Sequence, residues 1–226
     1  MKCGENRKTC PLCGSKDRHT SLPGPDGREF FLCRLCRLVF TDKKYFLSRE
    51  KERERYLQHN NSSDSPGYIE FLNRAVNPSI RFLGKRIAGL DYGCGPEPVL
   101  SQILKSRGFE SEWYDPIFYP ELDLDKRYGF IFSTETFEHF FSPAAELDRL
   151  RTLLSPGGIL TVMTKLRKSP ERFREWHYAR DPSHVAFYSR DTLEFISERW
   201  DIKIVYCDNE SVCIFRKPGQ FFIEQQ

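Results

Sequence analysis

The chain has 226 residues, of which 30% are charged and 39% hydrophobic, and its formal net charge is +3 at pH 7. It contains no apolar run of the roughly 18 or more residues that span a bilayer, and its first residues, MKCGENRKTC, lack the apolar segment of a secretory signal. These features exclude a membrane-spanning helix and predict a cytoplasmic, soluble protein with no membrane partner. The net charge is too small to indicate a nucleic-acid partner by itself.

Five of the eight cysteines lie within the first 36 residues. In a chain without an export signal, such clustering indicates metal binding before disulfides. Two C-x-x-C pairs, CPLC at 10–13 and CRLC at 33–36, can supply four thiolates to a tetrahedral zinc ion, which predicts a zinc ribbon over residues 1–44. The predicted metal ligands are Cys10, Cys13, Cys33 and Cys36, with Cys3 and His19 as alternatives of poorer spacing.

Four thiolates leave no open position for a substrate, so the zinc is expected to be structural. The ribbon's modest positive charge permits RNA contact without indicating it. Residues 45–83 follow as a helical linker or lid, with a charged helix over 45–58 and a second helix over 68–76. In the polar loop between them, His59 and Asn60 are either lid contacts or an ordinary helix cap and loop.

Residues 85–98 read as a short apolar strand that enters a glycine turn, and a helix follows over 99–107. Gly93 and Gly95 let the backbone take positive φ values and let a ligand come close. A dinucleotide site would need free N–H groups and no acid near its pyrophosphate, but Pro96 and Pro98 remove donors and Glu97 would repel phosphate. An acidic, donor-poor loop suits a cofactor without phosphates that carries cationic groups, namely S-adenosylmethionine. The alternative is an ordinary Gly/Pro turn.

A second apolar strand, 109–114, ends at Asp115, where an acidic residue would bind ribose hydroxyls. Only residues 116–127 separate it from the next strand, 128–133, which is too short a connection for a crossover helix and another strand. The third strand of a parallel sheet is therefore expected to be missing or vestigial. Leu122 and Leu124 are candidates for lining the adenine.

Polar residues cluster where the strand 128–133 ends, and a helix over 143–154, a P-G-G turn and a strand at 159–162 follow. The basic, aromatic stretch 165–180 then leads to His184, whose side chain has a suitable pKa for proton transfer. A structural role for this histidine is equally open. A helix over 191–199 and two alternating strands, 201–206 and 211–216, end the pattern.

Together these segments resemble the class I S-adenosylmethionine-dependent methyltransferases over residues 84–226. The turn matches D-x-G-x-G, although Glu97 stands at the last glycine, and T-E-T-F-E-H resembles the motif that faces the transferred methyl group, although Gly129 replaces its opening acid. The resemblance implies an α/β fold: a Rossmann-like sheet with helices on both faces and a terminal antiparallel hairpin. It implies cofactor binding by five residues: Asp91, Gly93, Gly95, Asp115 and Thr134.

The same resemblance implies a catalytic pocket formed by Glu135, His139 and His184. The acceptor is unidentified, and we expect a small molecule. Two alternatives remain open. The E-x-x-E-H letters also resemble the small-RNA 2′-O-methyltransferases, in which Glu135, Glu138 and His139 would hold Mg²⁺ with His184 or His177. The second alternative is a zinc-ribbon adaptor whose methyltransferase-like domain is degenerate. The sequence leaves the oligomeric state open.

Overall fold

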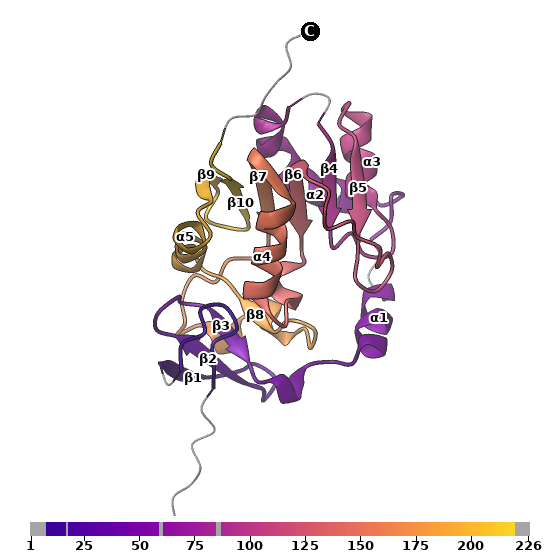
Figure 1. Cartoon of the computed structure of the whole chain (residues 1–226). Coiled ribbons are helices and arrows are strands. Elements are labelled where there is room, and N and C mark those ends of the chain that lie inside the picture. The colour runs from indigo at the N-terminus through magenta and orange to yellow at the C-terminus, as the bar shows by residue number, and fades with distance from the viewer. Residues whose placement is uncertain (1–7, 17, 59–60, 85–86, 220–226) are drawn as a thin grey trace, which may run out of the picture.

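The computed structural model describes residues 8–16, 18–58, 61–84 and 87–219. Its main feature is a six-stranded sheet in the order β5-β4-β6-β7-β10-β9 (Figure 1). The strands from β5 to β7 are parallel, and β10 runs antiparallel to both β7 and β9. The bounds are β4 Gly89–Tyr92, β5 Ser111–Tyr114, β6 Tyr128–Thr134, β7 Leu154–Met163, β9 Lys203–Cys207 and β10 Val212–Arg216. The predicted Rossmann-like sheet with a terminal antiparallel hairpin is confirmed.

The expected loss of the third strand is also confirmed, because β5 forms the edge of the sheet. Between β5 and β6 the described chain makes one isolated bridge, Asp115 with Tyr119, and no further strand. An ion pair between Lys126 and Glu112 ties this short connection to the edge strand.

Helices cover both faces of the sheet, as predicted. On one face, α2 (Pro66–Ser79) and α3 (Val99–Ser106) pack against apolar side chains of β6, β7 and β10. On the other face, α4 (Pro143–Leu153) and α5 (Arg190–Arg199) pack against alternate residues of the same strands (Figure 1). Because side chains along a strand alternate between faces, a single sheet can support both layers.

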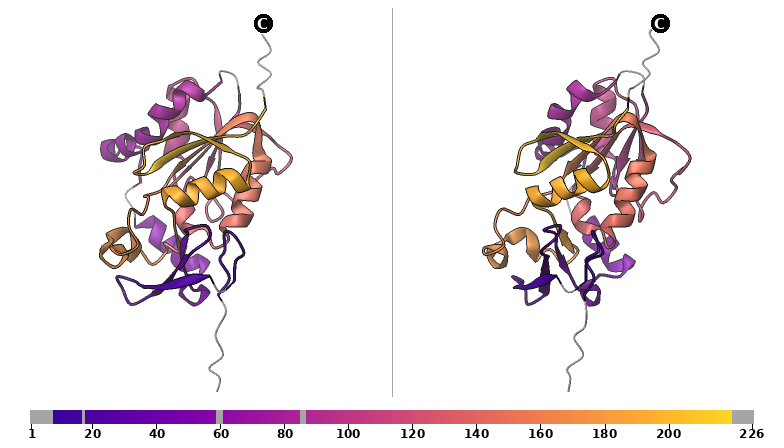
Figure 2. Two further views of the ribbon diagram at one scale, coloured as in Figure 1. Left: turned by 90° about the vertical axis from the view of Figure 1, so that its left-hand side faces the viewer. Right: turned by 60° about the vertical axis from the view of Figure 1, so that its left-hand side comes forward.

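The N-terminal residues form a second, four-stranded sheet in the order β1-β2-β3-β8. Its bounds are β1 His19–Pro23, β2 Glu29–Cys33, β3 Val39–Thr41 and β8 Ala186–Phe187. The first three strands belong to the predicted ribbon, whereas β8 lies between β7 and α5 in the chain. Figure 2 shows the ribbon, in indigo, at one end of the molecule, beside α4 and α5.

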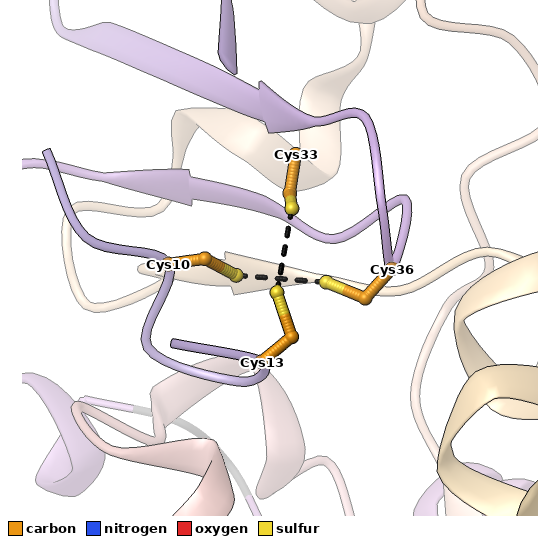
Figure 3. A group of neighbouring side chains, drawn as sticks. All are labelled: Cys10, Cys13, Cys33 and Cys36. Atoms are coloured by element: carbon orange, nitrogen blue, oxygen red, sulfur yellow. Dashed lines mark hydrogen bonds between the residues drawn. The ribbon is translucent and has the colours of Figure 1, made fainter. Parts of the chain in front are cut away.

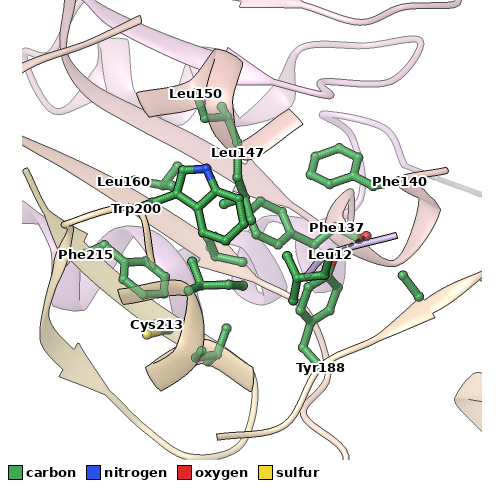
Figure 4. Packing of buried hydrophobic residues seen from close by; sticks show 14 of the residues in the cluster. Leu12, Phe137, Phe140, Leu147, Leu150, Leu160, Tyr188, Trp200, Cys213 and Phe215 are labelled. Atoms are coloured by element: carbon green, nitrogen blue, oxygen red, sulfur yellow. Dashed lines mark hydrogen bonds between the residues drawn. The ribbon is translucent and has the colours of Figure 1, made fainter. Parts of the chain in front are cut away.

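The ribbon shares a core with the larger sheet. Leu12, between the first two ribbon cysteines, is fully buried beside Phe137 and Tyr188 (Figure 4). The backbone N–H of Ala144, in α4, also donates to the Pro11 carbonyl at 3.3 Å. The predicted division at residues 44 and 83 stays a prediction, but the packing across the first boundary is continuous.

Helix α1 spans Arg49–Leu57, a later start than the predicted residue 45. The difference arises because Ser48 caps the helix by accepting the Lys51 N–H, while residues 43–45 form a separate 3₁₀ turn. The helix lies near the carboxyl ends of the parallel strands (Figure 1). None of the helices in the described parts of the chain has both the length and the apolar character needed to cross a bilayer.

Candidate active site

The glycine turn after β4 is held in one conformation by its neighbours. Gly93 and Gly95 have φ values of +85° and +69°, in the region that favours glycine. The N–H groups of Gly93 and Cys94 donate to the Tyr114 carbonyl, at the end of β5, at 2.8 and 3.1 Å. A Cβ at position 93 would lie 2.4 Å from the Thr136 side chain, so no larger residue fits there. The predicted turn is therefore built as the sequence indicated.

Asp115 lies beside this turn with both carboxylate oxygens engaged. Its Oδ2 accepts the Gly95 N–H at 3.1 Å, and its Oδ1 accepts the N–H groups of Ile117 and Phe118 at 2.8 and 3.0 Å. Oδ2 retains acceptor capacity, since a carboxylate oxygen has two lone pairs. The side chain lines the neighbouring cavity, as a ribose-binding carboxylate would.

Asp91 lies beneath the turn, with 1% of its surface exposed, and does not itself line the cavity. Its Oδ1 atom is buried with no hydrogen-bond partner among the described residues. Burial and then the charge of Asp115 raise the pKa of Asp91 to about 7. A cationic ligand nearby would lower the free-energy cost of ionising Asp91, whereas a pyrophosphate would raise it.

Glu97 does not line the cavity next to the turn. Its Oε1 atom accepts the Ser63 N–H at 3.1 Å, which joins the loop before α2 to the glycine turn. The residue that departs from the family motif is therefore a tether between the helical segment and the turn.

One cavity of about 440 Å³ extends from the turn to the carboxyl end of β6. Of the predicted cofactor residues, Gly93, Gly95, Asp115 and Thr134 line it. The described residues that line its other end include all three predicted catalytic side chains: Glu135, His139 and His184. Leu122 and Leu124 do not line it, and Leu124 is 56% exposed, so their contact with an adenine stays a prediction.

Two carboxylates meet one phenol at this far end. Tyr178 donates its hydroxyl proton to Glu138 Oε1 at 2.5 Å, and the hydroxyl oxygen of Tyr178 also lies 3.2 Å from Glu135 Oε2. Thr164 donates to the second oxygen of Glu138 at 2.7 Å. Burial and the charge of Glu138 raise the pKa of Glu135 well above its ordinary value. Glu135 also has a φ of +50°, a strained conformation for a residue with a side chain.

Two imidazoles face the same space, with ring centroids 4.8 Å apart. His139 Nδ1 lies 3.1 Å from the Ser183 carbonyl, and His184 Nδ1 lies 2.7 Å from the Tyr178 carbonyl. Because a carbonyl only accepts, each Nδ1 carries a proton, and in the neutral form of either ring the lone pair lies on Nε2. Burial lowers the pKa of His184 to about 4, so this ring is neutral at pH 7.

The structure also resolves which histidine joins the E-x-x-E-H residues. Glu138, His139 and His184 offer ligand atoms within 4.8 Å of one another. His177 instead lies 3.2 Å from Lys165 Nζ and does not line the cavity. Glu135 lines the cavity but is not part of this close group.

The four ribbon cysteines converge as predicted (Figure 3). The Sγ atoms of Cys10 and Cys36 are 3.5 Å apart, and those of Cys13 and Cys33 are 3.6 Å apart. Zinc–sulfur bonds of about 2.3 Å give tetrahedral sulfur–sulfur distances of about 3.8 Å, so this donor set fits the ion.

His19, one of the two alternative ligands, does not join the cysteine cluster. His19 Nε2 instead lies 3.1 Å from the Lys8 carbonyl. Cys3 lies outside the described residues, as do His59 and Asn60.

Several lining residues were not predicted. Tyr56 comes from α1, Thr136 follows β6, and Tyr178 and Asp181 belong to the segment after β7. The aromatic residues of the stretch 165–180 were the available signal, but aromatic enrichment does not distinguish a cavity wall from a core. Arg55 of α1 donates to Asp181 Oδ2 at 2.8 Å, which brings the helical segment against this wall.

This combination of a parallel sheet, a glycine turn and an acid after the next strand defines a class I S-adenosylmethionine-dependent methyltransferase. The sequence model described as "Methyltransferase domain" matches residues 56–206, about two thirds of the chain. The chain belongs to this family. No curated protein matches it.

Solved structures of similar fold include an S-adenosylmethionine-dependent methyltransferase from Methanosarcina mazei. It is 15% identical, with 62% of this chain and 97% of that chain covered and a TM-score of 0.48. The N-methyltransferase NodS from Bradyrhizobium japonicum is 14% identical, with 70% and 100% covered and a TM-score of 0.45. An O-methyltransferase family protein from Burkholderia thailandensis is 11% identical, with 74% and 63% covered and a TM-score of 0.45.

Proposed function

We propose that this methyltransferase transfers a methyl group to a hydroxyl of a small molecule bound at the histidine end of the cavity. The observation that carries the proposal is the single cavity that joins the glycine turn and Asp115 to Glu135, His139 and His184. Gly93 and Gly95 would lie against the methionine part of the cofactor, with Asp91 beneath them, and Asp115 and Thr134 would contact its adenosine. When bound, S-adenosylmethionine supplies an electrophilic methyl group.

The protein's contribution is to orient the acceptor and to accept its proton. A hydroxyl must lose a proton during transfer, and the Nε2 lone pair of His139 is placed to accept it. Because burial lowers the pKa of His184 to about 4, this ring is a weak base, and its Nε2 would instead accept a hydrogen bond from the acceptor. Backbone carbonyls at Nδ1 keep both rings in the required tautomer. Glu135, whose raised pKa favours the protonated form, would donate a hydrogen bond to the acceptor.

The size of the acceptor follows from how the cavity is closed. About 440 Å³ falls within the range of small-molecule sites, and the cofactor must share it. Tyr56 and Asn61 cover one side, and the Arg55–Asp181 ion pair holds α1 in place. A small acceptor fits this enclosure better than a polymer does.

The four cysteines are proposed to hold one structural zinc ion. Their thiolates fill every tetrahedral position, so the ion would stabilise the ribbon without contacting a substrate.

Calorimetry with S-adenosylhomocysteine, followed by transfer of labelled methyl groups to a panel of hydroxylated metabolites, tests the proposal. We expect binding of one ligand per chain and labelling of a small molecule. A protein that binds neither S-adenosylmethionine nor S-adenosylhomocysteine would instead be a ribbon adaptor with an inactive methyltransferase fold. Labelling of RNA alone would contradict the small acceptor.

A second candidate, metal-assisted transfer, is favoured by the group Glu138, His139 and His184. Histidines that bind a metal usually donate their other ring N–H to a carbonyl or carboxylate, as Nδ1 of His139 and His184 does here. Hydrogen bonds from Thr164 and Tyr178 hold Glu138 in a similar way. Two imidazoles and one carboxylate suit Mn²⁺, Fe²⁺ or Zn²⁺ better than Mg²⁺ and leave positions open for an acceptor oxygen. Elemental analysis after loading with Mn²⁺ tests this: two metals per chain are expected, falling to one in H139A. If the wild type and H139A both bound one metal per chain, there would be no second metal site, and the histidines would contact the acceptor directly.

A further inference from the structure

Arg28, directly before the ribbon's β2, has a buried guanidinium group whose five N–H donors all have acceptors. The side chain is 8% exposed. Its Nε donates to Asp26 Oδ2 at 2.7 Å. One terminal nitrogen donates to the carbonyls of Pro182 and His184 at 3.3 and 3.1 Å. The other donates to the carbonyls of Ala179 and Asp181 at 2.7 and 2.9 Å.

These four carbonyls belong to one turn, residues 179–184, which lies about 150 positions away in the chain. The turn carries the side chains of Asp181 and His184 into the cavity wall. Ribbon strand β3 pairs with β8 just after the turn, and the Thr41 N–H donates to the Val185 carbonyl at 3.0 Å. The ribbon therefore binds the carbonyls of the turn and also the residues that directly follow it.

None of the described ribbon residues lines the cavity itself. The cofactor end is held separately, by the hydrogen bonds of Gly93 and Cys94 to Tyr114 and of Gly95 to Asp115. The two ends of the cavity thus depend on different parts of the molecule.

We propose that Arg28 is a positioning residue through which the ribbon shapes the acceptor end of the cavity and leaves the cofactor end unaffected. This inference rests on the proposed function, which assigns this end of the cavity to the acceptor. The contact between Arg28 and the turn 179–184 does not depend on that assignment. The planar, forked guanidinium can reach four carbonyls at once, whereas the ammonium group of lysine is a single point with three donors.

Hydrogen exchange measured by mass spectrometry tests the coupling without any substrate. In R28M, the segment 176–188 should exchange about 10- to 100-fold faster, because charge-assisted hydrogen bonds to the turn are lost. Reporter amides in this segment include Ala179 and His184, which are hydrogen-bonded to Trp176 and Asp181. The segment 90–97 should exchange as in the wild type, and the affinity for S-adenosylhomocysteine should change less than about twofold.

Three variants make the result specific. R28K should fail to restore slow exchange, because lysine lacks the fork. D26N, which keeps Arg28 and changes only a turn residue, should give a smaller increase in the same segment. R34M is the matched control, since Arg34 is exposed on the same ribbon and contacts Thr20 rather than the turn.

Unchanged exchange over 176–188 in R28M would overturn the inference. So would an equal increase over 90–97, which would indicate global destabilisation, or full rescue by lysine. If the wild type bound no S-adenosylhomocysteine, the proposed function would fail, yet the exchange pattern would still decide whether Arg28 holds the turn.

Discussion

At the scale of single residues, Asp115 is a proposed cofactor-binding residue whose carboxylate is fixed by the backbone. Three backbone N–H groups orient its carboxylate, so its remaining lone pairs point in a fixed direction. In D115N one acceptor becomes an NH₂ donor that faces a backbone donor, and the charge is lost. We expect the dissociation constant for S-adenosylhomocysteine, measured by calorimetry, to rise about 10- to 100-fold, the value of one hydrogen bond to a charged group.

Asp123 supplies the matched control for this substitution. It also accepts a backbone N–H, from Asp125 at 2.9 Å, but it is exposed and outside the cavity. D123N should bind S-adenosylhomocysteine as the wild type does. Equal affinities for D115N and D123N would remove Asp115 from the cofactor site.

The pH dependence of stability reports on Asp91. Its folded pKa of about 7 exceeds its ordinary value of 3.8, so between these limits the folded state binds more protons than the unfolded state. This carboxyl therefore lowers stability as pH rises through the window and adds no further change above it. The shift corresponds to about 4 kcal/mol.

D91N should remove this penalty while keeping an acceptor for the Ser101 N–H. Urea unfolding of both proteins from pH 4 to 8 measures the effect. The difference in unfolding free energy should be near zero at pH 4 and should grow in favour of D91N up to about pH 7. Parallel curves across this range would show that Asp91 has an ordinary pKa.

Residues defined by local spacing were predictable, and residues defined by tertiary contact were not. Gly93, Gly95 and the four ribbon cysteines stand in short motifs whose geometry is set within a few residues. Arg28 and Tyr178 have no such motif, because their partners lie on distant segments. Sequence therefore located the cofactor turn and the cysteine cluster better than the opposite wall of the cavity.

At the scale of elements, the two cysteine knuckles have the same sequence pattern and different surroundings. Leu12 of the first is fully buried against Phe137 and Tyr188, whereas Leu35 of the second is 52% exposed. L12A should lower the free energy of unfolding by about 2–5 kcal/mol, the usual cost of a buried leucine. L35A should cost less than about 0.5 kcal/mol. Chemical denaturation measures both, and equal losses would contradict the docking of the first knuckle.

Elements long enough to show a regular spacing of apolar residues were predicted well, and short elements were not. Helix α3 could be predicted because its apolar positions repeat with helical period. The predicted range was 99–107, and the helix ends one residue earlier, at Ser106. Strand β8 has only two residues, which is too short for any periodic signal. It forms because β3 offers it a partner, so the joining of the ribbon to the larger fold could not be read from either segment alone.

At the scale of the whole molecule, the ribbon and the methyltransferase sheet should unfold as one unit. Leu12 and Leu38 belong to the same buried cluster as residues of α4 and α5, and Arg28 bonds the turn 179–184. Loss of the zinc proposed at the four cysteines would therefore expose part of the shared core. In a chain of this size each kcal/mol corresponds to about 2–4 °C, so losing the Leu12 contacts alone should lower Tm by about 10 °C.

Thermal unfolding followed by tryptophan fluorescence, with released zinc detected by a coloured chelator, measures this coupling. Because the two parts share a core, both signals should change in one transition with the same midpoint, and C13S should shift that midpoint downward. C207S is the control, since Cys207 is half-buried in β9, away from the ribbon. Zinc release at a lower temperature, with the fluorescence midpoint unchanged in C13S, would mean that the ribbon is an independent module attached to the methyltransferase.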